Sequence, residues 1–224
     1  MGHFSFNETE IDHNKDGFVD MNTGRQFNAA NFWQYISPKG LEMRWGVRLL
    51  DETRSGGQIT GSPYFVVSPE GLWKSEISNR RGEAFVKTGY IFKNKPGTSF
   101  GFINSFSVHE LDMLFGNKTY SGLQKSFYSN FIFHSDFKDT KHQYDAGFNF
   151  IYDNVTETLI DSSWNTEEMV PGVFFQYTYT FPEKITVMAG LREDYNNRFG
   201  FLTTPRLHVK YHINEKTTLR ASAG

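Results

Sequence analysis

Apolar and polar residues alternate with a period of two along most of this chain. From residue 142 to 153, one set of alternate positions reads His142, Tyr144, Ala146, Phe148, Phe150 and Tyr152. The positions between them read Gln143, Asp145, Gly147, Asn149, Ile151 and Asp153. Because successive side chains of a strand point to opposite faces, this pattern predicts a β-strand with one aromatic face and one largely polar face.

The same alternation recurs in nearly every apolar segment, and no segment shows the period of a helix. It predicts about ten antiparallel strands, near residues 3–7, 32–52, 83–93, 99–113, 120–135, 141–155, 172–181, 184–195, 205–213 and 216–224. The fold class is therefore all-β.

Short and long connections alternate between the predicted strands. We expect tight turns at residues 93–97, Pro182–Glu183 and Asn214–Glu215. Longer loops are expected at residues 55–73, 154–171 and 196–204, and the shorter connection 114–119 has the same parity. Short periplasmic turns and long extracellular loops are typical of outer-membrane barrels, whose strands need about 9–11 tilted residues to cross the membrane. A soluble sandwich or barrel would instead place the aromatic faces inside, and alternation alone leaves that alternative open.

Composition favours the membrane barrel. Aromatic residues make up 17% of the chain, including 23 Phe, whereas the formal net charge of −2 provides no basic field for nucleic acid. The absence of cysteine excludes disulfides, thiol catalysis and zinc–thiolate sites. Residues 1–6 do not have the pattern of a signal peptide, and the last residues read as a strand, so we expect residues 1–224 to be one partial barrel domain of a larger protein.

Short motifs near the C-terminus carry a family resemblance. They are the segment 187–195 with Gly190, Leu191, Arg192 and Asp194, the segment Thr204-Pro205-Arg206-Leu207, and the segment 217–224. Together they resemble the barrel of TonB-dependent outer-membrane receptors. Residues 12–18, followed by Phe27 and residues 31–35, look like a periplasmic turn and the next strand in Bacteroidota-type members, which are often grouped with vitamin B12 and ferric-siderophore receptors.

The resemblance implies a part of a plugged barrel of about 22 strands. This chain has about ten predicted strands and no recognisable plug, energy-coupling box or terminal aromatic strand end, so it corresponds to a middle portion of the wall. The implied partners are outer-membrane lipid, TonB through a missing N-terminal region, and a large scarce nutrient such as cobalamin, a ferric siderophore or haem. No catalytic constellation is present, so an enzyme is not expected. The alternatives are a soluble all-β binding or adhesion module and a passive porin.

One loop has the spacing of a calcium site. Asp12, Asn14, Asp16 and Asp20 occupy positions 1, 3, 5 and 9 of a calcium loop, and Gly17 supplies the bend. Position 12 is Thr23 and not Glu, so at most weak, structural Ca²⁺ binding is expected. The other interpretation is a turn that caps itself through Asp and Asn side chains. Strand parity puts this connection on the periplasmic side.

Aromatic and Arg side chains in or beside the long loops are candidates for contacting a large, partly charged ligand. They are Trp73, Arg80, Arg81, Tyr120 and Trp164. Trp and Tyr also form girdles at membrane interfaces, which is the alternative role. Four charged residues are expected to face the lumen, where they could contact a plug: Arg44, Arg48, Glu110 and Asp112.

Overall fold

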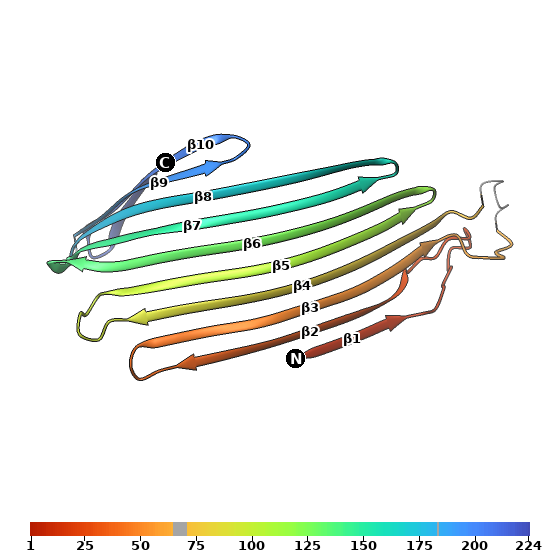
Figure 1. Ribbon diagram of the computed structural model, residues 1–224, viewed down its shortest axis with the longest axis horizontal. Coiled ribbons are helices and arrows are strands. Elements are labelled where there is room, and N and C mark those ends of the chain that lie inside the picture. Colours follow the sequence, from red (N-terminus) through yellow and green to blue (C-terminus); the bar gives the residue numbers. More distant parts are fainter. Residues whose placement is uncertain (65–70, 183) are drawn as a thin grey trace.

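The computed structural model describes residues 1–64, 71–182 and 184–224, and these residues form one antiparallel sheet (Figure 1). Its eleven strands pair in chain order, which confirms the all-β prediction. The strands are β1 (Gly2–Asn7), β2 (Thr23–Ile36), β3 (Leu41–Gly57), β4 (Lys74–Ile91), β5 (Ser99–Phe115), β6 (Lys118–Phe137), β7 (Asp139–Leu159), β8 (Ser162–Phe181), β9 (Ile185–Asn196), β10 (Gly200–Asn214) and β11 (Thr217–Ala223). Of the predicted turn Pro182–Glu183, Glu183 lies outside the described residues. No helix among the described residues has the length and apolarity needed to cross a membrane.

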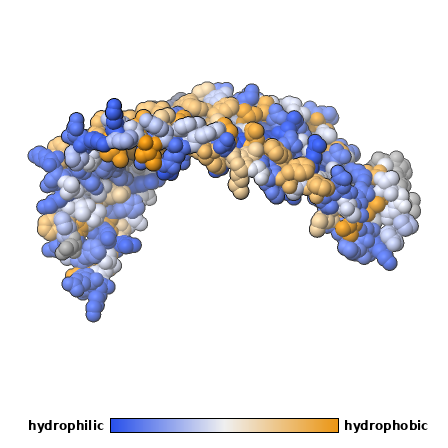
Figure 2. All heavy atoms as spheres, turned by 90° about the horizontal axis from the view of Figure 1, so that it is seen from below, coloured by the Kyte–Doolittle hydropathy of each residue, from blue (hydrophilic) through white to orange (hydrophobic). Residues whose placement is uncertain are grey.

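The sheet bends into an open arch and encloses no hydrophobic core of its own (Figure 2). Within the described residues no hydrophobic side chain is buried, and many large aromatic and aliphatic side chains are exposed. An exposed apolar surface this extensive is unfavourable in water, so it requires an apolar environment outside the chain.

Strand register sorts the side chains onto two faces. The aromatic face carries Phe102, Phe131 and Phe148 on neighbouring strands, with ring centroids of the last two 5.4 Å apart. On the opposite face, which we call the polar face, Asn130 lies opposite Asn149. The register shifts only between Asp136 and Phe137 and between His212 and Asn214, both near the turn end, so the other strand residues can be assigned to a face by their partners.

The two ends of the sheet differ. At the loop end lie residues 8–22, 58–64, 71–73, 116–117, 160–161 and 197–199, and at the turn end lie residues 37–40, 92–98, 138, 182, 184 and 215–216. Strands β6, β7 and β8 have 20, 21 and 20 residues. On β7 the aromatic face is apolar from His142 to Tyr152 and continues with Asn154, Thr156 and Thr158 toward the loop end. These strands therefore extend beyond the aromatic band.

That extension corrects two predicted loops. Residues 154–171 are mostly strand, joined by a turn at Ile160–Asp161, and the connection predicted at 196–204 is only residues 197–199. The positions that continue the aromatic face of β7 here, Asn154, Thr156 and Thr158, are polar, so the aromatic alternation ends and the pattern reads as a loop. The predicted asymmetry remains in the long connections 8–22 and 58–73.

The segment predicted as one strand, 32–52, is two strands with a turn at residues 37–40. The Gly40 N–H donates to the Ser37 carbonyl at 3.0 Å, and Gly40 has a φ of 96°, a conformation that favours glycine. This additional turn raises the number of strands to eleven. Each connection before it therefore lies at the opposite end of the sheet from the predicted one.

The reversed parity moves the 8–22 connection to the loop end, so its predicted periplasmic position is wrong. Phe18 forms a β-bridge with Gln58, and the Ile59 N–H donates to the Gly17 carbonyl at 2.8 Å. Residues 8–22 thus pack against the start of the other long connection.

Candidate functional site

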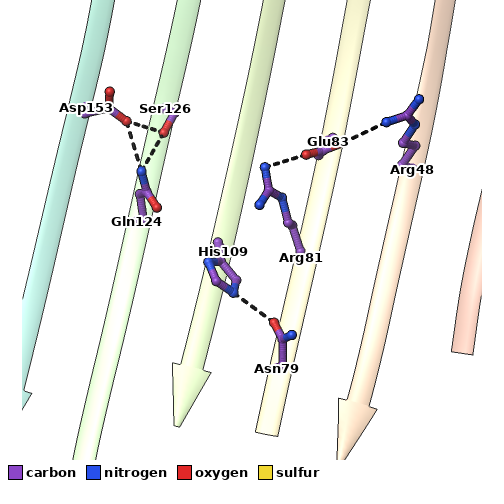
Figure 3. Close-up of polar contacts among 8 residues, drawn as sticks. All are labelled: Arg48, Asn79, Arg81, Glu83, His109, Gln124, Ser126 and Asp153. Atoms are coloured by element: carbon purple, nitrogen blue, oxygen red, sulfur yellow. Dashed lines mark hydrogen bonds and ion pairs between the residues drawn. The ribbon is translucent and has the colours of Figure 1, made fainter. Parts of the chain in front are cut away.

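The polar face carries a cluster of ion pairs near its middle (Figure 3). Glu83 on β4 forms an ion pair with Arg81 of the same strand at 2.6 Å and a longer one with Arg48 of β3 at 3.8 Å. The strand register brings these side chains together, because Arg48 lies directly opposite Glu83 and Arg81 is two residues from Glu83 on the same face. Two guanidinium groups share one carboxylate, so this trio keeps one formal positive charge.

Two further groups of hydrogen-bonded side chains lie beside these ion pairs on β4 to β7 (Figure 3). His109 bonds to Asn79 at 2.8 Å, and Gln124 donates to Asp153 at 3.1 Å. Ser126 also donates to Asp153. These side chains share the polar face, because their register partners do.

A shallow hollow of about 350 Å³ opens in the polar face between these groups. Short serine side chains form its floor, namely Ser105, Ser107 and Ser126. Its walls are Arg81, Glu83, Phe85, Tyr128, Ile151 and Asp153. The hollow therefore offers hydroxyl, carboxylate and guanidinium groups together with two aromatic rings.

Closer to the loop end, one carboxylate joins two of the predicted ligand residues. Tyr120 on β6 donates its hydroxyl to Glu157 on β7 at 2.8 Å, and the Trp164 indole on β8 donates to the other Glu157 oxygen at 2.9 Å. The hydrogen bond to Glu157 raises the pKa of Tyr120 above its ordinary value, and burial and the charge of Glu157 act in the same direction. Sequence reasoning missed Glu157 because it lies in a segment predicted as loop, although it is in phase with Asp153 on β7.

The neighbours Arg80 and Arg81 point to opposite faces, so the structure separates two residues predicted to act together. Arg80 lies on the aromatic face, 3.2 Å from Glu110 and 3.9 Å from Asp112. Consequently the predicted luminal placement of Glu110 and Asp112 is wrong, since both share the face of Arg80. The alternation of β4 and β5 continues past the aromatic band, where charged residues occupy the outward positions.

Two further predicted luminal residues have the expected placement. Arg44 and Arg48 both lie on the polar face of β3, because their partners Lys87 and Glu83 do. The Arg48 guanidinium also stands 5.2 Å from the centroid of the Phe32 ring.

Trp73 belongs to a different part of the loop end. Its ring lies 6.3 Å from that of Phe18, and its backbone N–H donates to Gln58 Oε1 at 2.7 Å. The ring also covers Gly116 in the β5–β6 turn, where a Cβ atom would approach Trp73 Cδ1 to 2.9 Å. Trp73 is therefore held by the 8–22 connection and by the β5–β6 turn, while its side chain stays partly exposed.

The Asp/Asn loop within residues 8–22 caps itself. Asp12 accepts the backbone N–H groups of Asp16 and Gly17 at 3.2 and 2.9 Å, and Asp20 accepts that of His13 at 2.6 Å. The Asn14 side chain likewise accepts the Asp16 N–H at 3.1 Å. Across the described ranges, no three His, Cys, Asp or Glu side chains converge on a point that could hold a metal. The geometry is that of an Asx-type turn, and calcium binding stays a prediction.

Comparison with known proteins gives a family and two similar structures. Residues 4–224 match the family model described as TonB dependent receptor-like, beta-barrel. The sheet is similar to the siderophore receptor PirA from Pseudomonas aeruginosa, with a TM-score of 0.54 and 13% identity over 98% of this chain and 40% of that one. It is also similar to the alcaligin outer membrane receptor FauA from Bordetella pertussis, with a TM-score of 0.60 and 13% identity over 92% of this chain and 41% of that one. No curated protein matches the sequence. The chain thus spans about 40% of the length of these solved receptors, and at this identity they show the fold alone.

Proposed function

Because this chain belongs to the TonB dependent receptor-like β-barrel family, whose barrels lie in the bacterial outer membrane, we propose that it forms part of the wall of an energy-coupled importer. The imported molecule is a large scarce nutrient: a ferric siderophore, a cobalamin or haem. Energy comes from TonB, acting through a region outside these residues.

The family gives the sheet an orientation. Its aromatic face meets lipid, which supplies the apolar environment that the exposed Phe and Tyr side chains require. Its polar face lines the lumen, and its loop end is extracellular, since long connections in such barrels are extracellular. Because the chain belongs to this family, we no longer consider the alternative of a soluble all-β module.

The observation that carries the proposal is the arrangement of charge and aromatic groups on the polar face. Arg48 and Arg81 share Glu83, which leaves a formal positive charge on the wall of the lumen. Closer to the extracellular end, the rings of Tyr120 and Trp164 flank Glu157. A large ligand would contact the rings first with its planar apolar groups, and its anionic groups would meet the guanidinium groups deeper in the lumen.

Ferric siderophores are the first ligand class to test. The two similar structures are named as a siderophore receptor and an alcaligin receptor. Cobalamin and haem remain the other members of the proposed class.

The test is ligand binding by the complete receptor that contains this chain. With a panel of anionic ferric siderophores, Arg81→Gln should weaken binding about tenfold, which corresponds to about 1.4 kcal/mol. The matched control is Arg80→Gln, the same change at the adjacent residue on the opposite face. Equal affinities for the two variants would contradict luminal ligand contact by Arg81.

The passive porin is the remaining alternative, and an uptake measurement separates it from the importer. Uptake of the bound ligand by living cells should stop when the proton gradient is dissipated. Uptake that continues at the same rate would indicate an open pore.

A further inference from the structure

Arg80 lies on the aromatic face, where it borders a hollow. A ligand in the lumen cannot reach this hollow, because the sheet lies between them. This lower hollow has a volume of about 360 Å³ and lies at the extracellular edge of the aromatic band. Its side walls are apolar at Phe27, Leu49 and Val108, and charged at Asp51, Arg80 and Glu110. Gly82 lies between Leu49 and Val108 in register, and its missing side chain leaves the space open.

A second, upper hollow of about 500 Å³ lies beyond the first on the same face. Most side chains that line it on this face carry hydroxyl groups: Thr53, Ser55, Ser78, Thr119, Ser121 and Thr158. Glu76, Asp112 and Leu114 complete this lining. Ser121 donates to Asp112 at 2.7 Å, so part of this hydrogen-bonding surface is already ordered.

The two hollows are continuous in register. Arg80 lies opposite Glu110, and Ser78 lies opposite Asp112, two residues farther along the same strands. Two residues of strand advance about 7 Å, so the hollows are neighbours. From the bilayer outward, the face therefore presents apolar groups, then charged groups, then hydroxyl groups.

We propose that these hollows bind the saccharide headgroup of an outer-leaflet glycolipid, with the upper part of an acyl chain against Phe27, Leu49 and Val108. The inference uses the membrane orientation of the family and does not depend on which nutrient is imported. The face lies against the outer leaflet, so a lipid of that leaflet is its neighbour. Hydroxyl groups both donate and accept hydrogen bonds, whereas carboxylates only accept them. Both kinds of group can therefore bond to the hydroxyl groups of a sugar.

Charge favours a sugar over a headgroup recognised by its phosphate alone. The carboxylates that border the hollows are Asp51, Glu76, Glu110 and Asp112. Among the lining residues, Arg80 is the cation whose side chain lies on this face, because Arg54 and Arg81 belong to the polar face by register. Arg80 already pairs with Glu110 and Asp112, so its attraction for a phosphate is largely offset. Its guanidinium still offers N–H donors to neutral sugar oxygens, because it is 56% exposed.

Substitution of Gly82 tests the lower hollow without disturbing the sheet. A Cβ atom at Gly82 would lie 3.8 Å from Leu49 Cδ2, which is an ordinary contact, so Gly82→Leu should fold and fill the space. The matched control is Gly101→Leu on the polar face of β5, where a Cβ atom meets nothing within 4 Å. Arg80→Gln tests the charged edge, with Arg81→Gln as its control on the other face.

The experiment measures lipid retained by the complete receptor in phosphatidylcholine nanodiscs, by native mass spectrometry, after addition of a lipooligosaccharide or of phosphatidylglycerol. We expect lipooligosaccharide retention to fall about tenfold in Gly82→Leu and in Arg80→Gln and to stay unchanged in both controls. Retention that is equal in all variants would overturn the site. Phosphatidylglycerol retained as well as lipooligosaccharide, and lost in the same variants, would overturn the saccharide assignment and leave an anionic-lipid groove.

Discussion

The Trp164 indole donates a 2.9 Å hydrogen bond to Glu157, its direct cross-strand partner on the polar face. Tyr120, on the other side of β7, donates to the second oxygen of the same carboxylate at 2.8 Å. One acidic side chain on β7 thus orients two aromatic rings from the neighbouring strands β6 and β8. These three side chains lie beyond the aromatic band, where the strands project toward the extracellular side. The two rings are therefore at the mouth of the proposed lumen.

Replacing Glu157 should change the titration of Tyr120. The raised pKa of Tyr120 rests first on its hydrogen bond to Glu157, so Glu157→Gln should bring this pKa back toward its ordinary value of 10.0. Because the folded pKa exceeds the unfolded one, the contact stabilises the fold in full below pH 10.0 and its contribution is lost as pH rises through the raised pKa. Ultraviolet titration of tyrosinate in the complete receptor measures the shift, with Tyr120→Phe identifying the signal of Tyr120. A titration curve unaltered by Glu157→Gln would contradict this origin of the shift.

Gly116 should tolerate no side chain, because two constraints meet there. Its φ of 61° disfavours other residues by about 1–2 kcal/mol, and a Cβ atom would also come within 2.9 Å of the Trp73 ring. Gly116→Ala should therefore destabilise the loop end by more than the backbone cost and change the fluorescence of Trp73. The control is Gly200→Ala, where φ is 81° and a Cβ atom meets nothing within 4 Å. Equal losses of stability in the two variants would show that the contact with Trp73 adds nothing.

Alternation predicted the strands of the aromatic band because lipid contact demands apolar side chains at every second position there. It failed where that demand ends. Residues 154–171 continue two strands beyond that band without aromatic alternation, and such a pattern is indistinguishable from a loop without the partner strand. Glu157 was missed for this reason.

One short turn accounts for the largest error. Residues 37–40 contain Pro38 and Gly40, which are both typical of turns, yet the prediction includes them in one long strand, 32–52. The missed turn placed the 8–22 connection at the wrong end of the sheet. The wrong luminal placement of Glu110 and Asp112 has a related cause, because face assignment depends on an exact count of residues along paired strands.

The turn end contains a buried hydroxyl pair that should matter for stability. Ser135 is fully buried and Thr98 is 4% exposed, and their hydroxyl oxygens lie 2.8 Å apart. Ser135→Ala would leave the Thr98 hydroxyl without this partner, at a cost of about 1–3 kcal/mol. Urea unfolding of the complete receptor measures the loss. Thr158 and Ser163 form a similar but exposed pair at 2.8 Å, so Ser163→Ala should cost no more than about 0.5 kcal/mol. A larger loss for Ser163→Ala than for Ser135→Ala would refute the role of burial.

Calcium binding by the 8–22 connection is the last prediction, and it now concerns the extracellular side. Asp12, Asn14, Asp16 and Asp20 supply side-chain oxygens, but several of these already accept backbone N–H groups within the loop. Binding must compete with those hydrogen bonds and lacks a Glu at the last loop position, so we expect affinity in the roughly millimolar range of extracellular modules. Calorimetric titration of the complete receptor with calcium should give heat that Asp16→Ala abolishes, whereas Asp161→Ala, an exposed carboxylate in the β7–β8 turn, should leave it unchanged. Negligible heats for the unmodified receptor and for Asp16→Ala alike would reduce the loop to a self-capped turn, whose function is to support the bridge between Phe18 and Gln58.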